Sequence, residues 1–287
     1  MSQILTAPTH HETPTEVAPG TYVIHEVQHA LGAPFSVYLN SMVIKAREPV
    51  LVDTGSARNR TAWLEDTFAL VDPHDVGWIF ISHEDPDHVG NLAEAMQLCP
   101  NATLVCSWAI VERFTSGFEF PLHRCRWAND GTSFEVGDRT LAVVRPPVYD
   151  SPTTRGLLDT STGVYWAADT FATPIPGGTD ATELAIDVAD LDHEFWQHGM
   201  SMYALNALSP WLQLIDPTRF ATEVTNVQNL DMTTIVSGHS PTINADQIPT
   251  AWDHLRALAG RHAPPIPDQA VLEVILAATM QVPTAGK

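Results

Sequence analysis

Lysine is scarce in this sequence. Its 287 residues include two lysines, Lys45 and Lys287, and lysine plus arginine number 14 against 34 aspartates plus glutamates, so the formal charge is −20. Sequence-independent binding to nucleic acids or to anionic membranes needs basic side chains that neutralise phosphates. We therefore expect neither a nucleic acid nor a membrane surface as a partner.

Cysteine and long apolar runs are also scarce. Cys99, Cys106 and Cys125 are odd in number and form no CxxC pair, so neither a disulfide framework nor a thiolate zinc site is indicated. The first twenty residues lack the basic start and apolar run of a secretory signal, and the apolar stretch AVLEVILAATM near the end is too short to span a bilayer. These absences predict a soluble cytoplasmic protein.

What the sequence does contain is enough apolar material for a sizeable core. With 44% hydrophobic residues, the length fits one large α/β domain. Residues 1–19 are rich in proline, threonine and histidine and are predicted to be a flexible arm. Alternating β-type runs and helix-like segments over residues 20–262 predict a single domain of two strand-and-helix halves. Residues 263–287 read as a proline-rich tail with a C-terminal helix that can pack on a partner, such as a second copy in a homodimer.

The segment ISHEDPDHVGN at 81–91 is the most informative part of the chain. It places His83, Asp85, Asp87 and His88 in one loop, directly after an apolar strand and before a helix. A single aspartate there would be read as a helix N-cap. Two histidines interleaved with two aspartates instead favour metal binding, and a loop of this kind can offer ligands to two ions on different sides.

This segment resembles the HxHxDH signature of the metallo-β-lactamase superfamily. It is closer still to the HxExDHxG form of flavodiiron proteins, with Pro86 and Gly90 also in register and Asp85 where those proteins usually have glutamate. The resemblance implies an α/β fold, the αββα sandwich of metallo-β-lactamase type, in which the metals lie at the sheet edge between the two halves.

The resemblance continues along the chain. Asp53 in LVDTG matches a family aspartate that orients a ligand, although an ordinary turn aspartate before glycine explains it equally well. Asp169 in WAADTF matches the metal-bridging aspartate, against the alternative of a strand-terminal turn. His239 in SGHSP matches the late histidine ligand and follows an apolar strand, as in the family.

One position departs from the flavodiiron pattern. The family has a histidine ligand 19 residues before the bridging aspartate, and here PVYDSP places Asp150 there. Tyr149 is the alternative ligand if the alignment shifts by one residue, and a plain loop aspartate beside proline is the alternative to any ligand role. A carboxylate at this position is similar to the metallo-β-lactamase-fold diiron β-hydroxylase of the chloramphenicol pathway.

The resemblance therefore implies two metal ions and seven ligands. The set is His83, Asp85 and Asp150 for one ion, Asp87, His88 and His239 for the other, and Asp169 between them. Four carboxylates, three imidazoles and no thiolate shift the preference from zinc toward iron or manganese, so iron is expected first, manganese second and zinc third.

One histidine outside this set, His29, is a candidate catalytic group. His29 lies eleven residues before Asn40, as does a non-ligating pocket histidine of flavodiiron proteins, and can donate a proton to a bound oxygen species; a partly buried structural role explains it equally well. His25, His193 and His198 are interpreted as structural residues.

The predicted function is that of a non-haem diiron oxidoreductase or oxygenase. Dioxygen, nitric oxide or a small organic molecule is the expected substrate, and because the chain ends soon after His239, without a flavodoxin domain, an external electron donor is expected. Two alternatives stay open: a dinuclear hydrolase that uses a bridging hydroxide, and a non-catalytic sensor of oxygen or nitric oxide.

Overall fold

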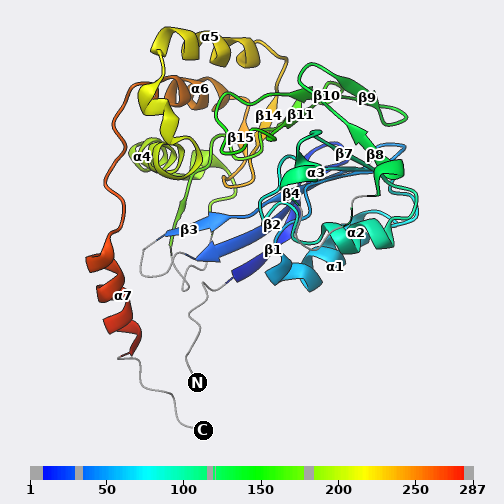
Figure 1. Ribbon diagram of the computed structural model, residues 1–287, viewed down its shortest axis with the longest axis horizontal. Coiled ribbons are helices and arrows are strands. Elements are labelled where there is room, and N and C mark those ends of the chain that lie inside the picture. The colour runs from blue at the N-terminus through cyan, green and yellow to red at the C-terminus, as the bar shows by residue number, and fades with distance from the viewer. Residues whose placement is uncertain (1–8, 30–34, 115–118, 120, 178–183, 281–287) are drawn as a thin grey trace.

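Two β-sheets face each other in the computed structural model of this protein, and helices cover their outer surfaces (Figure 1). The structure describes residues 9–29, 35–114, 119, 121–177 and 184–280. The αββα sandwich expected from the sequence is confirmed.

The first sheet comes mainly from the N-terminal half of the chain. Its strand order is β13-β3-β2-β4-β5-β6-β7-β8, with β1 paired to β2. The strands β5 to β8 run parallel to one another and the remaining pairs are antiparallel. The bounds are β1 (Thr9–Ala18), β2 (Thr21–His29), β3 (Phe35–Tyr38), β4 (Ser41–Ile44), β5 (Val50–Val52), β6 (Trp78–Phe80), β7 (Thr103–Cys106), β8 (Cys125–Trp127) and β13 (Ile175–Pro176).

The second sheet has the order β15-β14-β12-β11-β10-β9, in which only β12 and β14 are parallel neighbours. Its strands are β9 (Ser133–Glu135), β10 (Thr140–Val144), β11 (Gly156–Asp159), β12 (Val164–Trp166), β14 (Thr234–Val236) and β15 (Ile243–Asn244).

Each sheet has its own layer of helices. The first sheet is covered by α1 (Arg60–Leu70), α2 (Leu92–Leu98) and α3 (Ile110–Arg113), and the second by α4 (His193–Tyr203), α5 (Pro217–Gln228) and α6 (Ile248–Arg256). A π-helix (Ala204–Leu208) and a 3₁₀-helix (Pro210–Leu214) join α4 to the segment before α5, and α7 (Gln269–Met280) is the last element.

Side-chain alternation along the strands explains the four layers. Val52 and Phe80 point between the sheets, where they meet Trp166 and Val236 of the second sheet. Their neighbour Leu51 points the other way, toward the helices of the first half. Successive strand residues face opposite sides of a sheet, so strands of near-continuous apolar sequence are buried on both faces.

The parallel strands bring the sequence motifs to one edge. Asp53 follows β5, His83 follows β6, Asp169 follows β12 and His239 follows β14. Because β5 and β6 are parallel neighbours in one sheet, and β12 and β14 in the other, the carboxyl ends of each pair share an edge. The two edges meet where the sheets face each other.

The N-terminal segment differs from the expectation of a flexible arm over residues 1–19. Residues 9–18 form β1, which pairs antiparallel with β2, and residues 1–8 lie outside the described part. Threonine and valine suit an edge strand. Pro14, which has no N–H to donate, falls at the register shift between Glu12 and Thr15. Composition alone did not indicate this pairing.

The C-terminal segment is helical where the sequence predicted it. The helix α7 follows an extended proline-rich stretch and stands apart from the four layers at the lower left of Figure 1. Among the described residues, no helix combines the length and the apolar character needed to cross a membrane.

Gly90 sets the distance between the two loops that follow β5 and β6. Its N–H donates to Gly55 O at 2.9 Å, and a Cβ at this position would overlap the backbone of Ala57 and Gly55. We expect Gly90→Ala to lower the free energy of unfolding by about 2–3 kcal/mol, measured by urea denaturation, because neither backbone segment can move aside. Gly131→Ala is the control: its positive φ costs about 1 kcal/mol but nothing lies within 4 Å. Equal losses would contradict the prediction.

Candidate metal centre

Four loops from both halves of the sandwich bring histidine and aspartate side chains into one buried cluster. The structure brings together all seven residues that the sequence analysis named as ligands. Three groups have ligand atoms within 4.8 Å of one another: His83, His88 and Asp169; Asp87, His88 and His239; His83, Asp85 and Asp150.

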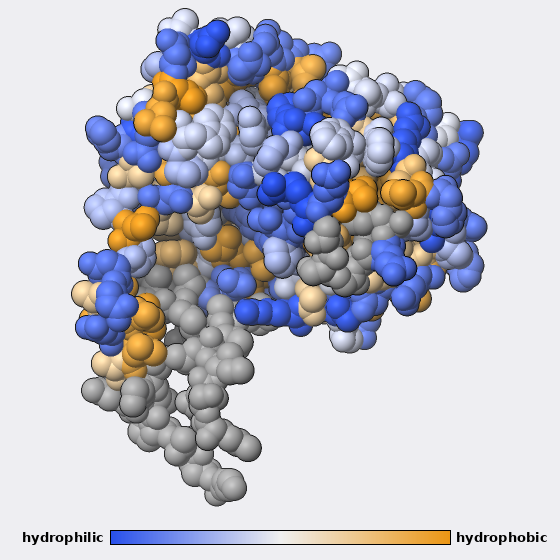
Figure 2. All heavy atoms as spheres, viewed as in Figure 1, coloured by the Kyte–Doolittle hydropathy of each residue, from blue (hydrophilic) through white to orange (hydrophobic). Residues whose placement is uncertain are grey.

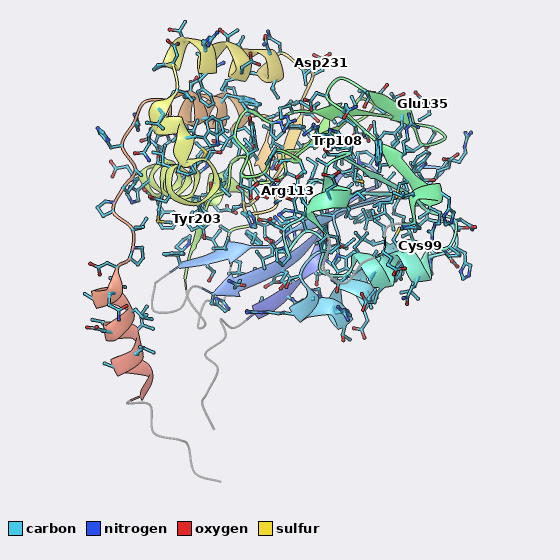
Figure 3. All side chains as sticks on the ribbon, in the orientation of Figure 1. Cys99, Trp108, Arg113, Glu135, Tyr203 and Asp231 are labelled. Carbon is cyan, nitrogen blue, oxygen red and sulfur yellow. The ribbon has the colours of Figure 1, made fainter. Side chains whose placement is uncertain are left out.

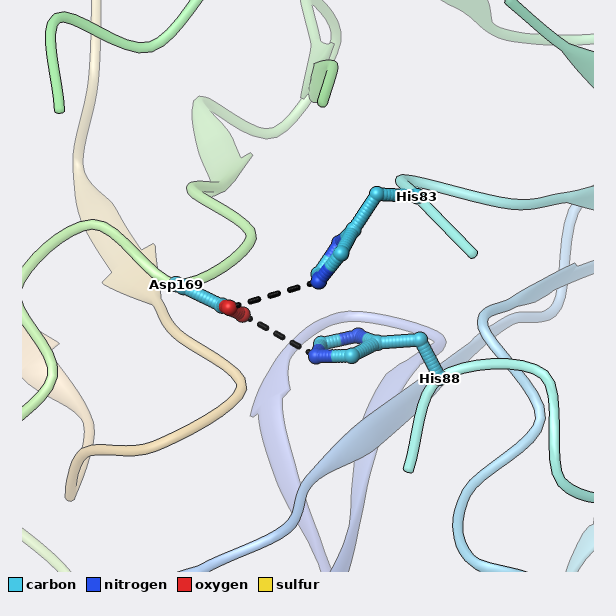
Figure 4. A group of neighbouring side chains, drawn as sticks. All are labelled: His83, His88 and Asp169. Carbon is cyan, nitrogen blue, oxygen red and sulfur yellow. Dashed lines mark ion pairs between the residues drawn. The ribbon is translucent and has the colours of Figure 1, made fainter. Parts of the chain in front are cut away.

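Asp169 lies at the middle of the cluster. One carboxylate oxygen, Oδ2, lies 3.3 Å from His83 Nε2, and the other, Oδ1, lies 3.0 Å from His88 Nε2 and 3.5 Å from His239 Nε2. Figure 4 shows the rings of His83 and His88 both directed at this carboxylate. Asp169 thus faces one group of residues with each oxygen, which is the arrangement of a bridging carboxylate.

The two ends of the cluster differ in exposure. At one end, His83 Nε2 lies 3.7 Å from Asp150 Oδ2 and 3.8 Å from Asp85 Oδ2, and the Asp85 side chain is 49% exposed. At the other end, Asp87 Oδ2 lies 3.7 Å from His88 Nε2 and 3.4 Å from His239 Nε2, and its side chain is 25% exposed. The end that contains Asp85 is the more accessible one.

The cluster fits metal ions better than it fits direct contacts between its members. His83 Nε2, His88 Nε2 and Asp169 Oδ1 are buried and have no hydrogen-bond partner among the described residues. Two ligand atoms that each lie about 2.1 Å from one ion lie about 3–4 Å apart, which is the range found here. Buried polar atoms are normally paired, so these unpaired atoms are suited to binding a cation.

The outer ring nitrogens of the three histidines all have oxygen partners. His88 Nδ1 lies 2.8 Å from Asp53 Oδ2, and His239 Nδ1 lies 2.8 Å from the carbonyl of Tyr38. His83 Nδ1 lies 3.0 Å from Ser82 Oγ. Because the Ser82 hydroxyl donates its proton to Asp53 Oδ2 at 2.6 Å, its oxygen accepts from the imidazole. With Nδ1 as donor, each ring turns an unprotonated Nε2 toward the cluster, as a metal ligand requires.

Asp53 links the halves of the sandwich behind the cluster. Its carboxylate is fully buried and accepts from the backbone N–H and the hydroxyl of Ser82, from His88, and from the indole Nε1 of Trp166 at 3.2 Å. Trp166 belongs to the second sheet, whereas Ser82 and His88 belong to the first half. The orienting role that the resemblance implied is the one this geometry supports, since a turn aspartate needs no partner 113 residues away.

The carboxylates of the cluster shift the pKa values of its histidines. Burial lowers the pKa of His88, but Asp169 and Asp87 outweigh burial and hold the pKa well above its usual value. For His239 the same opposition raises the pKa to about 9. Burial and Asp169 raise the pKa of the Asp150 carboxyl to about 6. These shifts show that the carboxylates favour positive charge inside the cluster, which a bound cation would supply.

The backbone around the cluster is strained. Among the described non-glycine residues, positive φ angles occur at Asp53 (55°), Ala168 (49°) and Phe171 (70°), one of them in the cluster's support and two beside Asp169. Gly238 packs so tightly that a Cβ would lie 2.9 Å from His88 Cε1 and 3.3 Å from Asp169 Oδ1. Such strain persists where the surrounding structure enforces a required geometry.

The structure distinguishes the two candidates at the position that departs from the family. Asp150 faces His83, whereas the ring of Tyr149 packs on Trp211 with centroids 5.3 Å apart. Tyr149 therefore points away from the cluster and Asp150 is the residue brought to it.

The other histidines named in the sequence analysis lie outside the cluster. His29 Nδ1 lies 2.6 Å from Ser36 Oγ, and within the described part no hydrogen bond or ion pair joins His29 to the seven residues. Its role as a proton donor stays a prediction. His25 is paired with Asn40 at 3.0 Å, and the ring of His193 packs on His254.

Glu84 is a supporting residue that the sequence analysis did not single out. Its carboxylate accepts from Ser151 Oγ at 3.0 Å, from Thr153 Oγ1 and from Arg113 of α3, which is labelled in Figure 3. These bonds tie the loop that carries Asp150 to the loop that carries His83. The signal was available in the sequence, because Glu84 lies inside the motif and hydroxyl residues flank Pro152, but only the tertiary structure pairs them.

Glu26 is a buried carboxyl on β2, near Asp87. Its Oε2 accepts from the Ser56 N–H at 3.4 Å, and Oε1 has no partner in the described part of the chain. Burial, opposed by the Ser56 bond and reinforced by Asp87, raises the pKa of Glu26 from 4.5 to about 7. The unfolded chain therefore releases this proton at a lower pH than the folded chain does.

We accordingly expect the stability of the wild type to fall, relative to Glu26→Gln, as pH rises from 4.5 to about 7. The glutamine keeps the shape but cannot ionise, so the difference in free energy of unfolding between the two proteins grows by an amount on the order of 1–3 kcal/mol and then levels off. Chemical denaturation at a series of pH values measures it. Parallel stability curves for the two proteins would contradict the prediction.

Comparison with known sequences identifies relatives that are longer than this chain. It is 24% identical over 239 residues to the putative diflavin flavoprotein A 1 of Nostoc sp., an alignment that covers 83% of this chain and 38% of the relative. The chain thus spans well under half the length of that relative.

Comparison with solved structures finds the same fold. The rubredoxin oxygen:oxidoreductase of Desulfovibrio gigas aligns with a TM-score of 0.68 at 16% identity, over 85% of this chain and 61% of the other. The flavodiiron protein of Giardia intestinalis aligns with a TM-score of 0.66 at 18% identity, over 86% of this chain and 60% of the other. At this level of identity the likeness establishes the fold.

A family model extends over most of the sandwich. It is described as the ODP family beta lactamase and matches residues 37–239, which run from β3 to the last histidine of the cluster. The match confirms the resemblance to the metallo-β-lactamase superfamily and its flavodiiron relatives that the motifs suggested. The chain belongs to the ODP family of beta-lactamase-like proteins.

Proposed function

We propose that the cluster holds two iron ions and that the protein is a diiron oxidoreductase. One ion is held by His83, Asp85 and Asp150, the other by Asp87, His88 and His239, and Asp169 bridges them. The observation that carries the proposal is the position of Asp169, whose two oxygens face different histidines, while the facing nitrogens of His83 and His88 have no hydrogen-bond partner among the described residues.

The donor set supports iron. Four carboxylates and three imidazoles offer more oxygen than nitrogen, and the described cysteines lie elsewhere: Cys99 and Cys106 belong to the apolar core of the first half. Hard oxygen donors suit iron and manganese better than zinc, and four carboxylates neutralise two divalent ions and offset most of the charge of two trivalent ions. Manganese is the second choice and zinc the third.

When bound, a pair of irons supplies the electron transfer that reduction of dioxygen or nitric oxide needs. The chain's own residues orient the histidine rings, fix the Asp150 loop and leave an access route to the cluster. Asp53, Ser82 and the Tyr38 carbonyl hold the three imidazoles in one tautomer, and Glu84 holds the Asp150 loop against the His83 loop. The half-exposed Asp85 end leaves an approach for a small molecule from solvent.

The substrate proposed is dioxygen, with nitric oxide as the second candidate. The fold is shared with a protein named for oxygen reduction with rubredoxin as its partner, and with a flavodiiron protein. These similarities support an oxidoreductase that takes electrons from a separate donor such as a small redox protein. Carboxylates at positions 85 and 150 favour this chemistry over hydrolysis, where the superfamily usually has histidine at position 85.

The stoichiometry of bound iron tests the assignment of ligands. We expect the wild type, purified from iron-supplemented cells, to hold about two irons per chain, Asp150→Asn about one, and Asp169→Asn less than one, because Asp169 serves both ions. Elemental analysis measures the iron, and circular dichroism shows whether each variant is folded.

The matched control is Asp246→Asn, which removes an exposed aspartate outside the cluster. It should keep the wild-type iron content. If Asp150→Asn and Asp246→Asn hold the same iron as the wild type, Asp150 is not a ligand; if the folded wild type takes up neither iron nor manganese, the centre itself is disproved.

Oxygen consumption tests the reaction. The iron-loaded protein, supplied with reduced rubredoxin, should consume dioxygen catalytically in an oxygen electrode, and Asp150→Asn should lower the rate by about 10–100-fold because one ligand set is incomplete. Stoichiometric uptake without turnover would instead indicate a sensor. A protein that retains zinc alone and hydrolyses bis(4-nitrophenyl) phosphate would contradict the proposal in favour of a hydrolase.

A further inference from the structure

A cavity of about 590 Å³ lies outside the metal cluster, between the segment that follows β10 and the helix α5 with the residues that precede it. Its size falls within the range of small-molecule sites, about 300–1,000 Å³. Figure 2 shows apolar side chains at the upper left of the molecule, over the segment that leads into α5. Nothing in the proposed metal chemistry uses this cavity.

One wall of the cavity is aromatic. Tyr149 and Trp211 pack with ring centroids 5.3 Å apart at 47°, and the guanidinium carbon of Arg145 lies 5.2 Å from the centroid of the Tyr149 ring. The aromatic pair is held in place, because Ser209 Oγ accepts from the Tyr149 N–H at 3.0 Å and donates to the Tyr149 carbonyl at 2.7 Å. A fixed aromatic wall suits a flat apolar ligand.

The remaining wall is apolar and partly exposed. It includes Phe220, Val227 and Ile215, and Leu214 at the mouth is 88% exposed. A leucine this exposed beside a cavity leaves apolar area that a ligand can cover.

Two arginines of this acidic protein, Arg145 and Arg219, line the cavity. Within the described residues the guanidinium of Arg219 forms no ion pair. Arg145 Nε lies 3.4 Å from Asp130, whose carboxylate is closer to Arg155 at 2.6 Å, so one aspartate serves two arginines. In a chain with a formal charge of −20, the Arg219 guanidinium is a local positive charge beside the cavity.

Two acidic residues also line the cavity and narrow the class of ligand. The Asp216 carboxylate is occupied as the N-cap of α5, where it accepts from the N–H groups of Thr218 and Arg219, each at 2.9 Å. Glu223 lies one helical turn beyond Arg219. Arg145 is already held by Asp130 and by the Pro152 carbonyl, so Arg219 is the guanidinium that is available to pair with an anionic ligand.

We propose that this cavity binds a small organic carboxylate with an aromatic body. The ring packs on Tyr149 and Trp211, and the carboxylate pairs with Arg219, because the fork geometry of a guanidinium is suited to carboxylates. The same segment carries Asp150 two residues before Pro152, whose carbonyl accepts from Arg145 at 2.9 Å. A ligand in the cavity thus lies against the loop that reaches the metal cluster.

Calorimetric titration of the purified full-length protein with 2-naphthoate tests the proposal. We expect saturable binding at one site, and weaker binding of the neutral 2-naphthamide by about tenfold or more, because the charged partner of Arg219 is missing. Arg219→Met should weaken binding of the acid by about tenfold while leaving the amide unchanged, and Trp211→Leu should weaken both. Arg219 is exposed on α5, so its substitution leaves the core intact.

The matched control is Arg261→Met, which removes an arginine that lines a different, smaller cavity near α4. It should bind 2-naphthoate like the wild type. The proposal is overturned if 2-naphthoate does not bind, if acid and amide bind equally, or if 2-naphthylmethylamine binds more tightly than the acid, which would assign the cavity to Glu223 and a cation. Since these measurements record binding alone, their failure leaves the iron proposal untouched, and loss of iron would leave this one untouched.

Discussion

The buried carboxylate of Asp53 is the interaction on which the centre depends. It gathers hydrogen bonds from Ser82 and His88 of the first half and from Trp166 of the second, behind the face that holds the cluster. Burial of a carboxylate is unfavourable unless its oxygens accept hydrogen bonds. Movement of these donors away from Asp53 would therefore destabilise the fold. The same bonds that join the sheets therefore decide which nitrogen of His88 faces the cluster, and through Ser82 they orient His83 as well.

The structure tolerates strain and crowding around this interaction. Left-handed backbone at Asp53 and Ala168 and the close approach of Gly238 to His88 are unfavourable locally, and they occur where loops from both sheets must meet within a few ångströms. The apolar layer between the sheets, with Phe80, Trp166 and Val236 buried directly beneath the loops, provides the rigid base from which the loops project. The packed core thus stabilises strained loops that hold charged side chains close together and away from water.

The departures from the family pattern alter the character of the centre in one direction. Asp85 is one methylene shorter than the glutamate of the flavodiiron motif, and Asp150 has a carboxylate where that motif has an imidazole. Both lie at the more exposed end, beside His83, whereas the end formed by Asp87, His88 and His239 keeps the usual residues. The loop that bears Asp150 also forms a wall of the aromatic cavity through Tyr149, so the part of the cluster that departs from the flavodiiron pattern adjoins this cavity.

Sequence alone was sufficient for the elements whose information is local. The sequence predicted the apolar strands that precede His83, Asp169 and His239 and the loop at 83–88, because strand periodicity and clusters of metal-binding residue types can be recognised over a few residues. Other features could not be predicted from local sequence. They are strand β1, the bonds of Ser151 and Thr153 to Glu84, the position of Asp150 rather than Tyr149 in the cluster, and the cavity lined by residues between 145 and 227. Each depends on which segments, distant in sequence, lie against one another, and pairing of that kind is decided by the packing of the two sheets rather than by any pattern within a single stretch of chain.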